Sequence, residues 1–183
     1  MEDREMKANR TVRDFEVALM NLLLTTSFER ITVDQICDEA LLHRSSFYRY
    51  FHDKYDLLEQ ALGAWVERIV DQTATEDDLI EALVSQIEAN RAMFSNLTNG
   101  GMRSSFSAEL VRMIAEILLA RRQTPSQNTI VVALKKAENP EMLAYVLSGA
   151  IMGAFYWWQE NNYHVPKAEV VTFIKRSVHA LVQ

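Results

Sequence analysis

Apolar residues recur at three- and four-residue spacing along almost the whole chain of 183 residues, and this spacing is the period of an α-helix. Only 5 Gly and 3 Pro interrupt the pattern, so the sequence offers few turns of the kind that join strands. The length allows a sizeable buried core, in one domain or in two small ones. We therefore expect an all-α fold.

Caps and apolar stripes predict where the helices lie. Counting cap residues, we expect helices over residues 9–25, 32–40, 44–50, 53–72, 75–90, 92–97, 104–122, 139–161 and 166–181. Thr32 and Gln35 have the spacing of a capping box, and Asn139 before Pro140 is a cap followed by a first-turn proline. Residues 129–136 stay open, because TIVVAL has the composition of a strand but no partner strand.

The single cysteine and the chain's hydropathy indicate a compartment. Cys37 has no second cysteine to pair with, which suits a reducing environment. It lies on the apolar face of 32–40, where a buried structural thiol is favoured over a redox sensor. The charged N-terminus does not resemble a signal peptide, and the most apolar stretch, 142–158, is interrupted by Ser148 and two glycines. We expect a cytoplasmic protein that makes no contact with membranes.

The charge balance does not by itself point to nucleic acid. The net charge is −6, and residues 1–60 carry 8 Lys and Arg against 12 Asp and Glu, or 8 − 12 = −4. Local charge matters more, because exposed charges more than about 8 Å apart are screened. Between residues 43 and 54, Asp53 is the only acid. Four basic residues are expected to form an arm before the first helix: Arg4, Lys7, Arg10 and Arg13.

Residues 32–54, TVDQICDEALLHRSSFYRYFHDK, combine two short helices with a break at 41–43. Such a pair presents its second helix to the major groove of DNA. Arg44 can pair with guanine, Ser45 can approach a base edge, and Arg49 lies near the same face. Hydroxyl and ammonium donors suited to phosphates surround them: Ser46, Tyr48, Tyr50 and Lys54. A polar helix face without DNA is the alternative, and the register of the whole set favours DNA.

The FYRYF run followed by DKYDLL resembles the helix-turn-helix of the TetR family of transcriptional regulators. This resemblance implies that Arg44, Ser45 and Arg49 face bases. It also implies contacts with the DNA backbone from five positions: Thr32, Ser46, Tyr48, Tyr50 and Lys54. Independently of the family, the helical spacing of Phe47 and Phe51 predicts that both face the core of this small domain.

The turn between the two helices departs from the family pattern. The sequence has Ala40-Leu41-Leu42-His43 where the family usually has Ala-Gly-Val-Ser. A glycine in this turn permits a left-handed backbone, which costs a residue such as leucine roughly 1 kcal/mol. Ser45 stands where a small residue or Gly is usual. We expect any strain in this domain to lie at Leu41.

A looser resemblance continues beyond residue 60. The segments 87–91, 148–153 and 157–158 are similar to the C-terminal domain of a TetR subgroup that includes regulators of dihydroxyacetone kinase genes. This implies a C-terminal helical domain that binds a ligand or partner and dimerises. We expect a DNA-binding domain over 1–52 and an effector-binding and dimerisation domain over 53–183.

Small residues in the helix of 139–161 predict a homodimer. Gly149 and Gly153 lie four residues apart, and each costs about 1 kcal/mol against alanine inside a helix, which suggests a close contact. The expected interface contains Gly149, Ala150, Gly153, Ala154, Trp157, Val170, Phe173 and Ile174. The alternative is that this strip packs inside one chain. A dimer also suits two recognition helices about 34 Å apart on a palindromic site.

Methionine and aromatic side chains are candidates for a ligand pocket, with one arginine that could pair with an anion. They are Met93, Phe94, Met102, Arg103, Phe106, Met113, Tyr145, Met152, Phe155 and Tyr156. Residues of this kind at helical spacing are also ordinary core residues, and this alternative stays open. The four His have no metal-ligand spacing, and no phosphate loop or nucleophile motif is present. We expect no catalytic residue, no metal and no cofactor.

These features predict a homodimeric repressor that a small-molecule effector releases from a palindromic double-stranded operator. The long helix from Lys54 is the expected lever, because it joins the DNA-binding domain to the effector domain. The alternative is a protein-interaction co-regulator of the same fold that acts through a partner protein. The acidic N-terminal half and Leu41 favour this alternative, whereas Arg44, Tyr48, Tyr50 and Lys54 in register oppose it.

Overall fold

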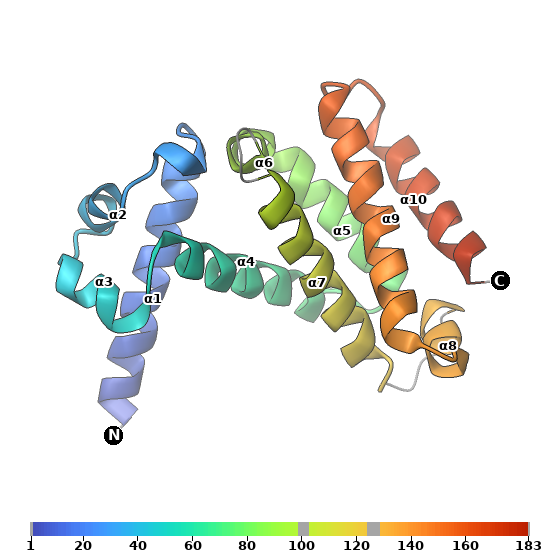
Figure 1. The fold of residues 1–183 in the computed structure, drawn as a ribbon, viewed down its shortest axis with the longest axis horizontal. Helices are drawn as coiled ribbons and strands as arrows, with labels where there is room; N and C mark the ends of the chain where they lie inside the picture. The colour runs from blue at the N-terminus through green and yellow to red at the C-terminus, as the bar shows by residue number, and fades with distance from the viewer. Residues whose placement is uncertain (1, 99–102, 124–128, 183) are drawn as a thin grey trace. The chain divides into compact units, whose positions relative to one another are not determined.

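The computed structural model describes residues 2–98, 103–123 and 129–182, with the side chains of 2–8, 76 and 103–107 left out. All regular structure in these residues is helical, which confirms the all-α prediction (Figure 1). The chain forms two compact units. The first contains Met1–Glu67 and Asn90–Arg103, and the second contains Arg68–Ala89 and Ser104–Gln183.

The first unit is built around an N-terminal helix. Its elements are α1 (Glu2–Leu23), the 3₁₀ turn η1 (Phe28–Arg30), α2 (Val33–Ala40), α3 (Arg44–Tyr50), most of α4 (Lys54–Asp71) and α6 (Arg91–Thr98). α1 packs against α2, α3 and α6. The Phe15 ring meets Phe47 and Phe51 edge-on, with centroids 5.4 and 5.9 Å away. Phe47 and Phe51 are fully buried, so the predicted anchors of this core are confirmed.

The first helix begins earlier than expected. α1 starts at Glu2 and not near Asn9, so the predicted arm of Arg4, Lys7, Arg10 and Arg13 is wrong: these residues lie within the helix. Arginine and lysine are good helix formers, and no glycine or proline stands before Asn9 to end the helix. At the other end, Asn96 Nδ2 of α6 donates to the Leu23 carbonyl at 2.9 Å, which satisfies one of the acceptors that a helix end leaves open.

The second unit packs the last helix against three others. Its elements are α5 (Glu76–Ala89), α7 (Arg103–Arg121), α8 (Thr129–Lys136), α9 (Pro140–Glu160) and α10 (Lys167–Leu181). α10 contacts α5, α8 and α9. The segment 129–136 is therefore a helix and not a strand. Ile130, Val131 and Leu134 form its buried face, so packing outweighs the weak helix propensity of a β-branched run.

Predicted caps lie where the sequence placed them. Asn139 Oδ1 accepts from Met142 N at 2.9 Å at the start of α9, and Asp53 Oδ1 accepts from Tyr55 N and Asp56 N at the start of α4. Each such side chain satisfies backbone donors that a helix start leaves without partners.

Membrane-spanning helices and metal-binding clusters are both absent from the described ranges. None of the helices there is both long enough and apolar enough to cross a bilayer. Within the same residues, no three His, Cys, Asp or Glu side chains gather in a group that could hold a metal ion.

Candidate nucleic-acid interface

The start of α2 is fixed by a capping box. Thr32 Oγ1 accepts from Gln35 N at 3.2 Å, and Thr32 N donates to Gln35 Oε1 at 2.9 Å. This confirms the predicted cap, which is worth about 1 kcal/mol in a helix of only two turns. The hydroxyl of Thr32 thus has a structural role, and its expected contact with a DNA backbone stays a prediction.

The turn after α2 adopts the left-handed backbone that the family's glycine would supply. Leu41 has φ 54° and ψ 37°. Leu42 N donates to Cys37 O at 3.0 Å and Leu41 N donates to Asp38 O at 3.2 Å, and together these bonds form a Schellman motif. The Leu41 side chain is 91% exposed. The chain therefore keeps the turn geometry despite the cost of a left-handed leucine.

One face of α3 is polar and exposed. Phe47 is buried against α1, and the opposite side presents Arg44, Ser45, Tyr48 and Arg49 to solvent. Positions i, i+1, i+4 and i+5 lie on a single face of a helix. Ser46 and Tyr50 are half-buried and lie outside this face. The structure thus brings the predicted base-facing residues Arg44, Ser45 and Arg49 to one surface.

Arg44 is held by two neighbours. Its Nη1 lies 2.5 Å from Asp34 Oδ1 of α2, and its Nη2 donates to the Tyr48 hydroxyl at 3.1 Å. The hydrogen bond with Tyr48, followed by that with Asp34, raises the pKa of Arg44. A guanidinium has five N–H donors, so it still has donors for a guanine edge. Sequence reasoning did not find Asp34, because its ten-residue separation from Arg44 becomes a contact only through the turn.

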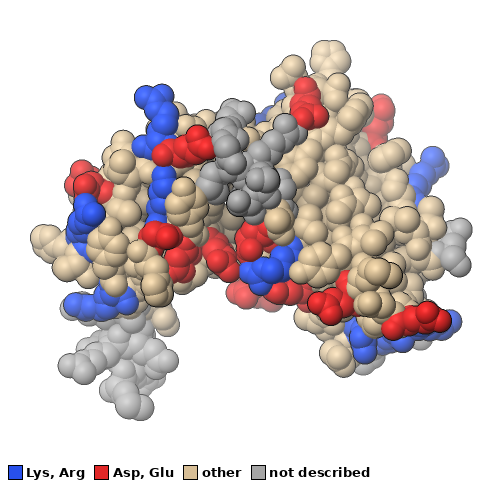
Figure 2. All heavy atoms as spheres, in the orientation of Figure 1, with Lys and Arg blue, Asp and Glu red and all other residues tan. Residues whose placement is uncertain are grey.

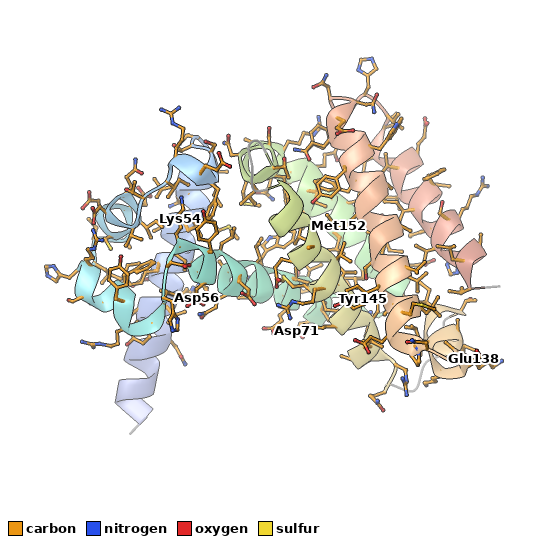
Figure 3. All side chains as sticks on the ribbon, viewed as in Figure 1. Lys54, Asp56, Asp71, Glu138, Tyr145 and Met152 are labelled. Atoms are coloured by element: carbon orange, nitrogen blue, oxygen red, sulfur yellow. The ribbon has the colours of Figure 1, made fainter. Side chains whose placement is uncertain are left out.

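Lys54 makes three hydrogen bonds inside the first unit, and its expected contact with a phosphate stays a prediction. Its Nζ donates to the carbonyls of Phe28 at 2.9 Å, Glu29 at 3.0 Å and Ile31 at 2.8 Å. Figure 3 shows Lys54 at the start of α4. Burial lowers the pKa of Lys54, and the charge of Glu29 partly offsets this. An ammonium has three donors, and here all three are used inside the chain.

The charges around these helices are mixed in sign. Figure 2 shows Lys and Arg side chains interspersed with Asp and Glu on the visible face of the first unit. On α3 itself, the positive charges are those of Arg44 and Arg49, and both side chains are exposed.

The expected ligand residues do not form one group. Met93 and Phe94 are buried in the first unit, where Phe94 contacts the ring of Trp65. The second unit buries Met113, Met152 and Phe155, while Tyr156 is half-buried and Tyr145 is exposed. Figure 3 shows Tyr145 and Met152 on α9. Met102 lies outside the described residues, as do the side chains of Arg103 and Phe106.

A groove on the second unit follows the predicted dimerisation strip. It measures about 680 Å³ and runs between α9 and α10. Its lining contains Ala150, Gly153, Ala154, Trp157, Val165, Glu169, Val170, Phe173 and Ser177. Trp157 and Phe173 are 53% and 65% exposed, whereas Val170 and Ile174 are buried within the chain. Figure 2 shows a surface without charged groups over the middle of α9.

The two glycines of this strip leave open space beside the helix. A Cβ added at Gly149 or Gly153 would meet nothing within 4 Å, apart from its own neighbours in the helix. Both residues are exposed. Packing inside the described chain therefore does not require a glycine at either position.

Solved structures with the same fold are transcriptional regulators. A TetR transcriptional regulator from Streptococcus agalactiae 2603V is 17% identical, with a TM-score of 0.61 over 97% of this chain and 98% of that one. The dihydroxyacetone kinase operon activator DhaS is 12% identical, with a TM-score of 0.62 over 94% and 96%. NalD, the secondary repressor of the MexAB-OprM multidrug efflux pump in Pseudomonas aeruginosa, is 15% identical, with a TM-score of 0.56 over 96% and 97%.

Sequence families match both parts of the chain, although no curated protein matches it. The family described as "Bacterial regulatory proteins, tetR family" matches residues 17–61. This matched segment contains η1, α2, α3 and the turn at Leu41. The family described as "Transcriptional regulator C-terminal region" matches residues 75–180, more than half of the chain. The protein therefore belongs to the TetR family of bacterial transcriptional regulators.

Proposed function

We propose that the protein is a homodimeric repressor that binds a palindromic DNA operator through α3 and releases it when a small molecule binds the second unit. The observation that carries this proposal is the exposed polar face of α3, set by a buried Phe47 on one side and by the Schellman turn at its start. A helix of this kind can enter the major groove with its first residues at the base edges.

Base reading is assigned to Arg44, Ser45 and Arg49. Arg44 lies at the first position of α3, where the helix of such a motif meets bases, and Asp34 with Tyr48 holds its guanidinium in one orientation. The hydroxyls of Ser46, Tyr48 and Tyr50 flank this face and suit phosphate oxygens. Arg44 is thus expected to discriminate between sequences, and the hydroxyls to add affinity for any duplex.

A second copy of the chain is the proposed occupant of the groove between α9 and α10. The groove is mainly apolar, it is flanked by exposed Trp157 and Phe173, and the glycines leave room for a helix to approach closely. A two-fold interface would bring the same strip of both copies together. It would also supply the two recognition helices that a palindromic operator requires.

The effector is proposed to bind in the second unit, among Met113, Met152 and Phe155. Methionine and aromatic side chains adapt to varied apolar ligands. Arg121 connects the end of α7 to the end of α4. Its Nη2 donates to the carbonyl of Val70 at 3.1 Å and to that of Thr73, just after α4, at 3.2 Å. A ligand that moves α7 would therefore act on α4 directly.

An electrophoretic shift assay at increasing salt tests DNA binding. Genomic fragments from around the gene serve as probes, and the oligomeric state is measured in the same buffers. Binding is expected to weaken with salt by about 0.9 logarithmic units per tenfold increase for each phosphate contacted. An intact dimer that binds no fragment at low salt would refute the repressor and favour the co-regulator that acts through a partner protein.

Two substitutions separate base reading from phosphate contact. Arg44→Ala is expected to relax specificity at one operator position by about 1–3 kcal/mol. Ser46→Ala, which removes a hydroxyl assigned to phosphate and leaves the partners of Arg44 in place, is expected to weaken binding to all sequences alike. Lys136→Ala, which removes an exposed charge at the end of α8, is the control and should change neither. Equal effects of Arg44→Ala on every sequence would contradict the assignment of Arg44 to a base.

A further inference from the structure

Lys54 lies at the joint where the start of α4 meets Phe28–Ile31, the segment that precedes α2 and α3. Its three bonds, of 2.8 to 3.0 Å, end on the carbonyls of Phe28, Glu29 and Ile31, which belong to η1 and the residue that caps it. The next residue, Thr32, caps α2. A single ammonium therefore connects the first turn of α4 to the residue before the helix-turn-helix.

Aromatic and apolar contacts close the same joint. Phe28 and Ile31 are buried, and the Tyr55 ring meets the Phe28 ring edge-on with centroids 5.3 Å apart. Lys54 Nζ also lies 4.8 Å from the centre of the Phe28 ring. Moving the ammonium away would leave three carbonyls without these hydrogen bonds and would lose the cation–π contact. The ammonium is thus held in one place.

We propose that Lys54 is a positioning residue, which fixes α2 and α3 relative to α4 and does not bind phosphate. The start of α2 is tied through Ile31 and Thr32, and α2 is tied to α3 by the ion pair of Asp34 with Arg44 across the Leu41 turn. A displacement at Thr32 therefore moves both helices together. This inference rests on the proposed function, because the position of α3 matters only if α3 reads DNA.

The two roles of Lys54 predict different effects of Lys54→Met on DNA binding. Loss of a phosphate contact weakens binding to every duplex and reduces the salt slope by about 0.9. Loss of positioning displaces α3 from the bases, so the operator loses about tenfold in affinity, comparable to one mismatched base pair. Binding to unrelated DNA changes less than about twofold, and the salt slope stays the same.

The experiment uses the full-length protein and two probes. One is the duplex that the wild-type protein enriches from a random-sequence library, and the other is an unrelated duplex of equal length. Lys54→Met and Lys54→Arg are compared with Arg30→Met, a control that removes an exposed positive charge from η1. The ratio of the two affinities is the readout, since partial unfolding would reduce both affinities equally.

Lys54→Arg distinguishes charge from geometry. Arginine keeps the charge, but its planar fork cannot direct three donors from one nitrogen to three carbonyls. We expect the ratio to fall about tenfold in both Lys54 variants and to stay within about twofold of wild type in Arg30→Met. An arginine that restores wild-type binding, or a salt slope that drops by about one in Lys54→Met, overturns the proposal.

Amide hydrogen exchange provides a readout that does not depend on DNA. The amides of Ile36 and Cys37 in α2 are expected to exchange at least about tenfold faster in Lys54→Met than in Arg30→Met, measured well below the thermal transition. Equal protection of α2 in both variants overturns the positioning role. A wild-type protein that enriches no duplex counts against the proposed function, and the exchange result then decides the role of Lys54 alone.

Discussion

Leu41 has two unfavourable features: its backbone is left-handed, and the residue is almost fully exposed. Leu41→Gly is expected to raise the free energy of unfolding by about 1 kcal/mol, because glycine adopts this backbone without strain. Urea unfolding measures the change. Leu24→Gly removes another exposed leucine, from a position without a positive φ, and should give no gain. An equal gain from both would assign the effect to exposure and not to strain.

Cys37 is expected to be unreactive while the protein is folded. Burial, followed by the charge of Asp34, raises the pKa of the Cys37 thiol, so less thiolate forms at a given pH. Its reaction with a thiol reagent at pH 8 should be at least about tenfold slower in the folded protein than in urea. The raised pKa also means that the thiol's contribution to stability is present below the unfolded value of about 8.5 and is lost as pH rises through the folded value. Equal labelling rates would contradict this burial.

At single residues, the sequence predicted local features better than distant ones. The cap at Thr32 and the buried rings of Phe47 and Phe51 follow from spacing within a few residues, and the structure confirms them. The partners of Lys54 lie 23 to 26 positions earlier in the chain, so spacing near the helix start did not predict them. A sequence shows which donors exist, but not which carbonyls the fold brings to them.

The capping box of α2 gives a prediction for a whole element. Thr32→Ala removes the acceptor for Gln35 N, so we expect the free energy of unfolding to fall by about 1 kcal/mol and α2 to fray. Thr32→Ser keeps the hydroxyl and serves as the matched control. Circular dichroism during urea unfolding measures both variants. An alanine variant as stable as the serine variant would show that the box does not hold this helix.

Among the helices, length and packing decided what could be predicted. The long α9 and α4 have strong stripes and clear caps, and their ends agree with the prediction to within a residue or two. The sequence of α8 is ambiguous because Ile130, Val131 and Val132 favour strands locally, and packing against α9 and α10 favours the helix. The sequence also did not predict that the expected ligand residues divide between two units, because spacing within a helix does not show which unit buries that helix.

At the scale of the whole molecule, substitutions of Gly149 and Gly153 are expected to have opposite effects on folding and on assembly. An added methyl group meets nothing inside the chain at either site, so Gly149→Ala and Gly153→Ala should stabilise the isolated fold by about 1 kcal/mol each. The same methyl groups would hold a second copy apart and weaken the proposed dimer. Sedimentation at several concentrations measures dissociation, and unfolding of the dilute protein measures stability.

Gly63→Ala is the control for the glycine variants, because its Cβ also meets nothing within 4 Å but lies in α4, away from the groove. It should stabilise the chain without changing dissociation. If all three variants leave dissociation unchanged, the strip does not form the proposed interface.

The membership of α6 in the first unit has a consequence for biosynthesis. α6 follows α5 in the chain, yet Asn96 closes the end of α1 and Phe94 contacts Trp65. A ribosome making this protein therefore releases α1 to α4 first and must add α5 before the last piece of the reading unit emerges. The nascent DNA-binding part stays incomplete until about residue 98 has left the exit tunnel, so a truncated product ending after α4 would lack part of its own core and be exposed to proteases.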